Sequence, residues 1–121
     1  MKVSDTDNLK SSYFVFCEGT ENSSERISDN FKEVYSKTKD FRKIGSAALE
    51  ICWIATGRAE GYVIYGIPIW DIASGILILS EAGGSLHDFH KKIMGWNDFR
   101  IDKDHNLIAS NGNIPLSFRI K

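Results

Sequence analysis

The 121-residue chain is short of cysteine, proline and surplus charge of either sign. Its two cysteines, Cys17 and Cys52, lie far apart in apolar surroundings, which favours reduced core thiols over a disulfide or a metal-binding pair. Fifteen Lys and Arg residues face sixteen Asp and Glu residues, giving a formal net charge of −1. This balance argues against bulk electrostatic binding to nucleic acid or to an anionic membrane.

Long hydrophobic runs are missing as well. The apolar run at residues 76–79 is far too short to span a bilayer. Residues 1–12 are polar, so no signal peptide is expected and a cytoplasmic location is predicted. The chain has no nucleophile elbow, no P-loop and no paired Cys-x-x-Cys motif. Its length predicts one domain over residues 12–121, after a flexible leader over residues 1–11.

Hydrophobic periodicity predicts alternating strands and helices. Strands are expected at residues 13–17, 41–44, 61–65, 85–89 and 107–110. Helices are expected at residues 27–37, with caps offered by residues 20–24, then from Gly45-Ser46 to a stop at Gly57, and at residues 70–81. The polar segment 90–106 is expected to be a long surface loop. This alternation predicts an α/β layered sandwich of one mixed central sheet with helices on both faces.

Asp71 is the most informative single residue. It stands at the predicted start of the third helix, which is otherwise apolar and is expected to be largely buried. Backbone N–H groups and the helix dipole favour negative charge there, so the carboxylate could hold a metal ion or face a phosphate-bearing site. The alternative is a carboxylate that only caps its helix.

Three motifs resemble the inositol monophosphatase family. Residues 41–50 (Phe-Arg-Lys-Ile-Gly-Ser-Ala-Ala-Leu-Glu) resemble its strand-to-helix motif. Residues 70–75 (Trp-Asp-Ile-Ala-Ser-Gly), with Glu-Ala-Gly-Gly at residues 81–84, resemble its C-terminal signature, and residues 107–111 resemble its last strand. The motifs come in the family order, and the resemblance covers roughly residues 12–115.

This resemblance implies a Mg²⁺-dependent phosphatase that acts on small phosphomonoesters such as inositol or sugar phosphates. It implies that Asp71 is a metal ligand, in keeping with the preference of Mg²⁺ for hard oxygen donors. It also implies that Gly45, Ser46 and Ala47 line the substrate side. On the residues alone, the alternative for this segment is a simple helix start with Ser46 as its cap.

Two departures from the family pattern bear on function. Ile64 stands where the family often has a glutamate that holds substrate hydroxyls, which favours a different sugar phosphate or no substrate. The Gly-Glu-Glu segment and the Asp-Pro-Ile-Asp-Gly-Thr loop of the family's N-terminal lobe occur nowhere in the chain. The resemblance therefore implies a C-terminal lobe with a weak or incomplete Mg²⁺ site and no catalytic residue of its own.

Two hypotheses follow. In the first, the chain is the C-terminal lobe of a Mg²⁺-dependent phosphatase. It is inactive without an N-terminal lobe supplied by another chain, or it is one piece of a longer ancestral enzyme. In the second, it is a non-catalytic binding or assembly module, a remnant that binds a small polyol, a phosphate or a protein. The small-molecule partner expected overall is a phosphorylated polyol or sugar. Because a separated lobe should leave apolar surface uncovered, either hypothesis predicts a homo-oligomer or a heteromeric partner.

Overall fold

The computed structural model describes residues 1–19 and 23–121 of the chain. Residues 20–22, part of the segment expected to cap the first helix, lie outside the described residues. Within them, Ser23 caps that helix by accepting a hydrogen bond from the backbone N–H of Arg26. The strands and helices, with three short 3₁₀ turns, are β1 (Tyr13–Cys17), α1 (Ser24–Lys37), β2 (Asp40–Arg42), α2 (Ala47–Ala55), β3 (Gly61–Ile67), α3 (Ala73–Glu81), β4 (Ser85–His87) and β5 (His105–Ser110), and the turns η1 (Leu9–Ser11), η2 (Ile69–Asp71) and η3 (Trp96–Asp98).

The strands form one mixed sheet in the order β2-β1-β3-β5-β4. Strand β1 pairs in parallel with both β2 and β3, whereas β5 pairs antiparallel with β3 and β4. Helix α1 connects β1 to β2 and α2 connects β2 to β3, and such helical crossovers are what parallel strands require. The predicted mixed sheet is thereby confirmed.

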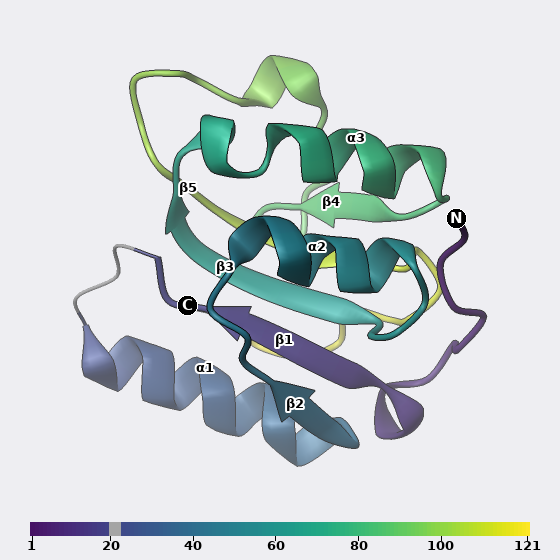
Figure 1. Cartoon of the computed structure of the whole chain (residues 1–121). Helices are drawn as coiled ribbons and strands as arrows, with labels where there is room; N and C mark the ends of the chain where they lie inside the picture. Colours follow the sequence, from purple (N-terminus) through teal and green to yellow (C-terminus); the bar gives the residue numbers. More distant parts are fainter. Residues whose placement is uncertain (20–22) are drawn as a thin grey trace.

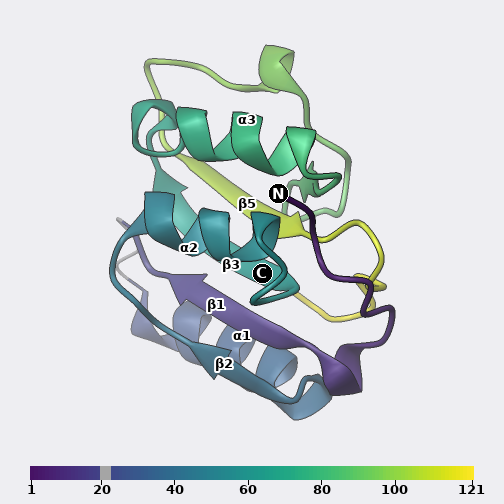
Figure 2. The ribbon, with the colours of Figure 1, turned by 45° about the vertical axis from the view of Figure 1, so that its right-hand side comes forward.

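Alternation along the strands divides the core into two layers. Phe14 of β1 and Val63 of β3 point to the face covered by α1. Val15 of β1 and Ile64 of β3 point to the opposite face, covered by α2 and α3. Figures 1 and 2 show α2 and α3 side by side on one face and α1 on the other, so the predicted α/β sandwich with helices on both faces is confirmed.

The third helix begins later than the sequence predicts. Residues Ile69–Asp71 form the separate turn η2, and α3 starts only at Ala73 because Ile72 adopts φ −130° and ψ 0°, outside helical geometry. Trp70 and Asp71 are exposed rather than placed at a buried helix start. The helix is also only partly covered: Ile76 and Leu79 are buried, but Leu77 is exposed.

Residues 1–11, predicted as a flexible leader, make specific contacts with the domain. Val3 is buried, and its N–H donates to the carbonyl of Ala82 at 3.2 Å. The side-chain amide of Asn111 donates to the carbonyl of Ser4 at 3.1 Å. Among the described helices, none is long and apolar enough to cross a membrane.

Candidate functional site

The parallel strands β1, β2 and β3 all end at the same edge of the sheet. Each is followed there by a charged residue: Glu18 after β1, Lys43 after β2 and Asp71 in the turn after β3. In Figure 1 the chain enters both α2 and α3 at this edge. Open α/β sheets bind ligands outside the carboxyl ends of their strands, which makes this edge the candidate site.

The segment between β2 and α2 is a tight turn at the head of a helix. Gly45 has φ +93°, in the left-handed region that glycine occupies without strain. Ser46 is the N-cap of α2, and its Oγ accepts the N–H of Leu49 at 3.4 Å, so the predicted role of Ser46 as a cap is confirmed. Among the described residues, the N–H groups of Ala47 and Ala48 have no hydrogen-bond partner and are open to a ligand.

Glu50 holds this turn in place by hydrogen bonds, and the sequence did not predict this role. Its side chain is fully buried, and Oε2 accepts the N–H groups of Ile44 at 2.8 Å and Gly45 at 3.3 Å. Its other oxygen, Oε1, accepts the hydroxyl of Tyr62 at 2.6 Å. A lone acid inside an apolar helix was the available signal. Glu50 thus occupies the N–H groups of Ile44 and Gly45, and the N–H groups of Ala47 and Ala48 remain as donors for a substrate.

Tyr62 and Cys17 extend this buried polar cluster under the site. Burial, reinforced by the bond to Glu50, raises the pKa of Tyr62 far above its usual range, so its hydroxyl stays a donor. Cys17 ends β1 beside Tyr62, and burial raises the pKa of its thiol. Both Cys17 and Cys52 are free thiols, as predicted, although each is only partly buried.

An ion pair links the ends of two parallel strands. Lys43 donates from Nζ to Oε1 of Glu18, and both side chains are about half exposed. Exposed pairs of this kind contribute little to stability. Lys43 lies two residues before Gly45 in the sequence, and the two charges of the pair compensate each other.

Asp71 is accessible and is not a helix cap. The cap position of α3 is Ile72, which makes no side-chain cap bond, so the alternative role expected for Asp71 is not found. The backbone N–H of Asp71 donates to the carbonyl of Pro68 at 3.1 Å. Its carboxylate has no hydrogen bond or ion pair with any residue that the structure describes.

The residues present do not fit a self-contained Mg²⁺ site. Across residues 1–19 and 23–121 there is no group of three or more His, Cys, Asp or Glu side chains that could hold a metal ion. Asp71 alone supplies one carboxylate where Mg²⁺ usually takes carboxylates together with waters and substrate phosphate. Ile64 is fully buried in the core under α2 and α3, so it offers nothing to a substrate hydroxyl.

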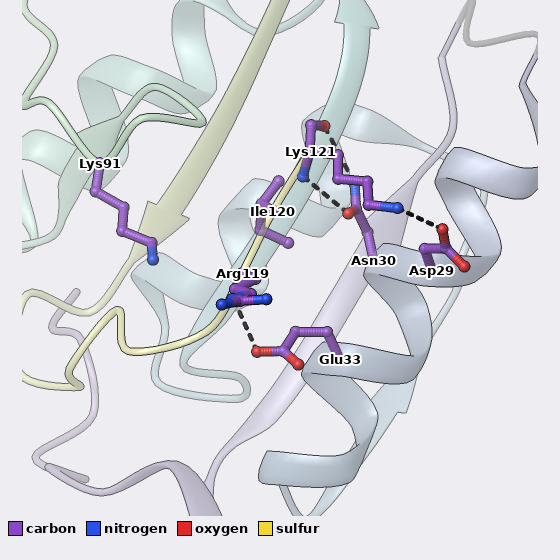
Figure 3. A pocket seen from close by; sticks show the side chains of 7 residues that line it. All are labelled: Asp29, Asn30, Glu33, Lys91, Arg119, Ile120 and Lys121. Atoms are coloured by element: carbon purple, nitrogen blue, oxygen red, sulfur yellow. Dashed lines mark hydrogen bonds and ion pairs between the residues drawn. The ribbon is translucent and has the colours of Figure 1, made fainter.

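A separate pocket of about 480 Å³ lies between α1 and residues 119–121, and Figure 3 shows its side chains. One ion pair joins two of its lining residues, because Lys121 Nζ donates to Asp29 at 2.6 Å, and the backbone N–H of Arg119 donates to Glu33 at 2.8 Å. None of the four predicted site residues lines it. It is lined by Asp29, Asn30, Glu33, Lys91, Arg119, Ile120 and Lys121.

Comparison with known proteins identifies a family that matches nearly the whole chain. The profile of the inositol monophosphatase family matches residues 1–117. Nus factor SuhB of Xylella fastidiosa is 40% identical over 85 residues, which are 70% of this chain and 30% of the relative. Nus factor SuhB of Escherichia coli K12 is 42% identical over 82 residues, which are 68% of this chain and 28% of the relative.

Solved structures of inositol monophosphatase and suhB proteins have the same fold as this chain. Inositol monophosphatase from Anabaena superposes with a TM-score of 0.81 at 31% identity, covering 94% of this chain and 45% of that chain. The suhB protein of Bartonella henselae gives 0.79 at 29%, covering 93% and 41%. The chain belongs to the inositol monophosphatase family. It spans less than a third of these curated relatives and less than half of these solved ones.

Proposed function

We propose that this chain contributes one wall of a Mg²⁺-dependent phosphatase site for small sugar or inositol phosphomonoesters. In this proposal, Asp71 gives one metal ligand, Gly45, Ser46 and Ala47 face the substrate, and a lobe outside this chain brings the remaining carboxylates. The observation that carries the proposal is the placement of Asp71 and the Glu50-anchored turn at the same edge of the parallel strands.

The chemistry of this wall suits a phosphorylated ligand. The open N–H groups at the head of α2 attract anionic or hydroxyl oxygens, because the helix dipole is positive there. Glu50 keeps the turn rigid, so these donors need not reorganise when a ligand binds. The two free thiols fit a reducing, cytoplasmic location.

Mg²⁺ would supply charge neutralisation and an activated water in such a site. One carboxylate cannot assemble that arrangement, so the isolated chain should be inactive with Mg²⁺ on a panel of sugar and inositol phosphates. Robust turnover by the isolated chain would contradict the need for a second lobe.

Asp71→Asn tests the metal role in an enzyme reconstituted with an N-terminal lobe. Activity should fall by more than about tenfold, because even residues that only support metal ligands are worth about 10–100-fold. Asp5→Asn, a change at an exposed carboxylate of the N-terminal segment, is the matched control. Unaltered activity of the Asp71 variant would exclude a working ligand.

The second candidate function is a non-catalytic binding or assembly module. The buried Ile64 and the missing acids favour it. Titration of the chain with inositol monophosphate, followed by backbone amide NMR without Mg²⁺, separates the two functions. Shifts at Ala47 and Ala48, together with no turnover after reconstitution, would favour a binding module.

A further inference from the structure

The pocket of about 480 Å³ beside α1 contains two acids, and a lysine neutralises each of them. Asp29 accepts a hydrogen bond from Lys121 Nζ at 2.6 Å, and Glu33 accepts one from Lys37 Nζ at 2.8 Å. The hydrogen bond from Lys37 is the main cause that lowers the pKa of Glu33 below its usual range. The two acids of the pocket, taken with their lysines, therefore contribute little net charge.

Two further cations, Lys91 and Arg119, line the same pocket. Neither of them makes an ion pair with a side chain that the structure describes. The side chains of both are exposed, and Nζ of Lys91 lies 5.7 Å from the centroid of the Phe118 ring. In Figure 3 the side chains of Lys91 and Arg119 extend from two separate segments toward the same space. The pocket therefore carries a surplus of two positive charges.

The backbone that carries Lys91 is fixed in a conformation that side chains rarely adopt. Lys91 has φ +67°, in the left-handed region. The carbonyl of Asp88 accepts the N–H of Lys91 at 2.9 Å, and Oδ1 of Asp88 accepts the N–H groups of His90 and Lys92, each at 2.9 Å. Such a conformation persists only where the surrounding structure enforces it. The turn thus sets the position of Lys91 beside the pocket.

The segment that carries Arg119 is anchored on both sides. The preceding residue, Phe118, is buried in the core. The backbone N–H of Arg119 donates to Glu33 at 2.8 Å, and the backbone N–H of Lys121 donates to Oδ1 of Asn30 at 2.9 Å. Both cations of the pocket therefore stand on a backbone that is already ordered, which lowers the entropic cost of binding an anion.

We propose that this pocket binds a phosphate dianion, free or carried by a small phosphomonoester, with Lys91 and Arg119 as its cationic contacts. A phosphomonoester carries a charge of about −1.5 to −2 near pH 7, which matches the charge of Lys91 and Arg119 together. The planar fork of an arginine can donate to two phosphate oxygens, and a lysine adds a point charge. The volume of about 480 Å³ lies within the range of about 300–1,000 Å³ that is usual for small-molecule sites.

This anion site is separate from the candidate phosphatase site. None of Asp71, Gly45, Ser46 and Ala47 lines the pocket. Figures 1 and 2 show α1, which forms one wall of the pocket, on the side of the sheet away from α2 and α3. Binding at the pocket requires neither Mg²⁺ nor a second lobe, so it is measured on the 121-residue chain independently of the proposed function.

The test is backbone amide NMR of the 121-residue chain during titration with inorganic phosphate. The amides of Lys91, Arg119 and Lys121 should shift together and saturate with a Kd of about 1 mM or lower. Shifts that do not saturate by about tenfold that concentration would overturn the proposal. Saturable shifts confined to Ala47 and Ala48 would also overturn it, because they would place the phosphate at the head of α2.

Lys91→Gln and Arg119→Gln should each raise the Kd for phosphate at least about tenfold, because each removes a charge-assisted hydrogen bond. Lys92→Gln and Arg58→Gln are the matched controls, since they remove the same charge at exposed positions outside this pocket. The controls should bind phosphate within about twofold of wild type, because solvent and salt screen distant surface charges. Equal weakening by the controls would reveal only general attraction to cations and would overturn the proposal. Circular dichroism checks that all four variants are folded.

Two further titrations define the ligand. Dimethyl phosphate carries a single charge and should bind at least about tenfold more weakly than inorganic phosphate, because it pairs fully with only one of the two cations. Equal binding of dimethyl phosphate would overturn the preference for a dianion. Glycerol 2-phosphate distinguishes the sources of the dianion. Tighter binding than that of inorganic phosphate would assign the pocket to a phosphomonoester, and weaker binding would assign it to free phosphate; either result supports the site.

Discussion

Tyr62 donates its hydroxyl to Glu50 across the layer between β3 and α2, at 2.6 Å, and both side chains are shielded from solvent. The second carboxylate oxygen of Glu50 holds the turn that carries Gly45. A residue of the sheet is thus connected through one buried acid to the backbone of the candidate site.

Glu50→Ala should destabilise the chain by about 1–3 kcal/mol. The change leaves the buried hydroxyl of Tyr62 without an acceptor, which costs about that much, and releases two N–H groups of the exposed turn to water. Urea unfolding followed by circular dichroism measures the loss. Glu81→Ala, at an exposed position at the end of α3, should leave the midpoint nearly unchanged. An equal effect of the two substitutions would contradict the anchoring role of Glu50.

Gly75→Ala should also destabilise the chain. A Cβ at Gly75 would lie 2.1 Å from Cγ2 of Ile51, a fully buried side chain with no room to move away. Overpacking costs about 1–3 kcal/mol, and the better helix propensity of alanine offsets about 1 kcal/mol. Ser74→Ala, at the neighbouring exposed position, receives the propensity gain alone and should be neutral or stabilising in the same unfolding measurement.

Mild acid should weaken the fold through His87. Burial lowers the pKa of His87 below its ordinary 6.5, against a smaller opposing effect of Asp88, and its Nδ1 is buried without a partner among the described residues. The unfolded chain therefore takes up a proton more readily than the folded one. The contribution of His87 to the unfolding free energy is fully present above the pKa of the unfolded chain. It is lost as the pH falls through 6.5 towards the lower pKa of His87 in the folded chain.

Unfolding free energies measured between about pH 7.5 and about pH 5.5 check this window, which lies above the range where carboxylates titrate. His87→Gln should flatten the dependence, and His90→Gln, at an exposed position, should retain it. A slope that survives His87→Gln would assign the pH dependence to another group.

Cys17 should react slowly with alkylating reagents. Burial raises the pKa of its thiol, so less of the reactive thiolate is present near neutral pH. Mass spectrometry of the chain after iodoacetamide treatment, native and in urea, measures the protection. Glu50→Gln removes a negative charge that itself raises the pKa of Cys17, so alkylation in this variant should become faster. A native rate equal to that in urea would contradict the shielding of Cys17.

Local signals made much of the fold predictable. Ser46 before an apolar run and Gly57 after it define α2 within two residues, and alternation defines β1 and β3. The role of Glu50 could not be predicted, because its partner Tyr62 lies twelve residues away on another layer. The predicted start of α3 at residue 70 was wrong. Residues 70–81 have helical apolar spacing, but the backbone at Ile72 departs from helical geometry.

The site was predictable only in part. The position of Asp71 in a family motif suggested a ligand, but the sequence does not show that its carboxylate stays exposed and unpaired among the described residues. The three-dimensional arrangement, not the motif, reveals that Glu50 already uses two amides of the turn at Gly45.

The hydrogen bond from Asn111 to Ser4 spans 107 positions of the chain. Contacts of such separation close late in folding, because the intervening chain must first be ordered. During synthesis the segment that contains Ser4 therefore cannot complete its native hydrogen bonds until Asn111 has left the ribosome.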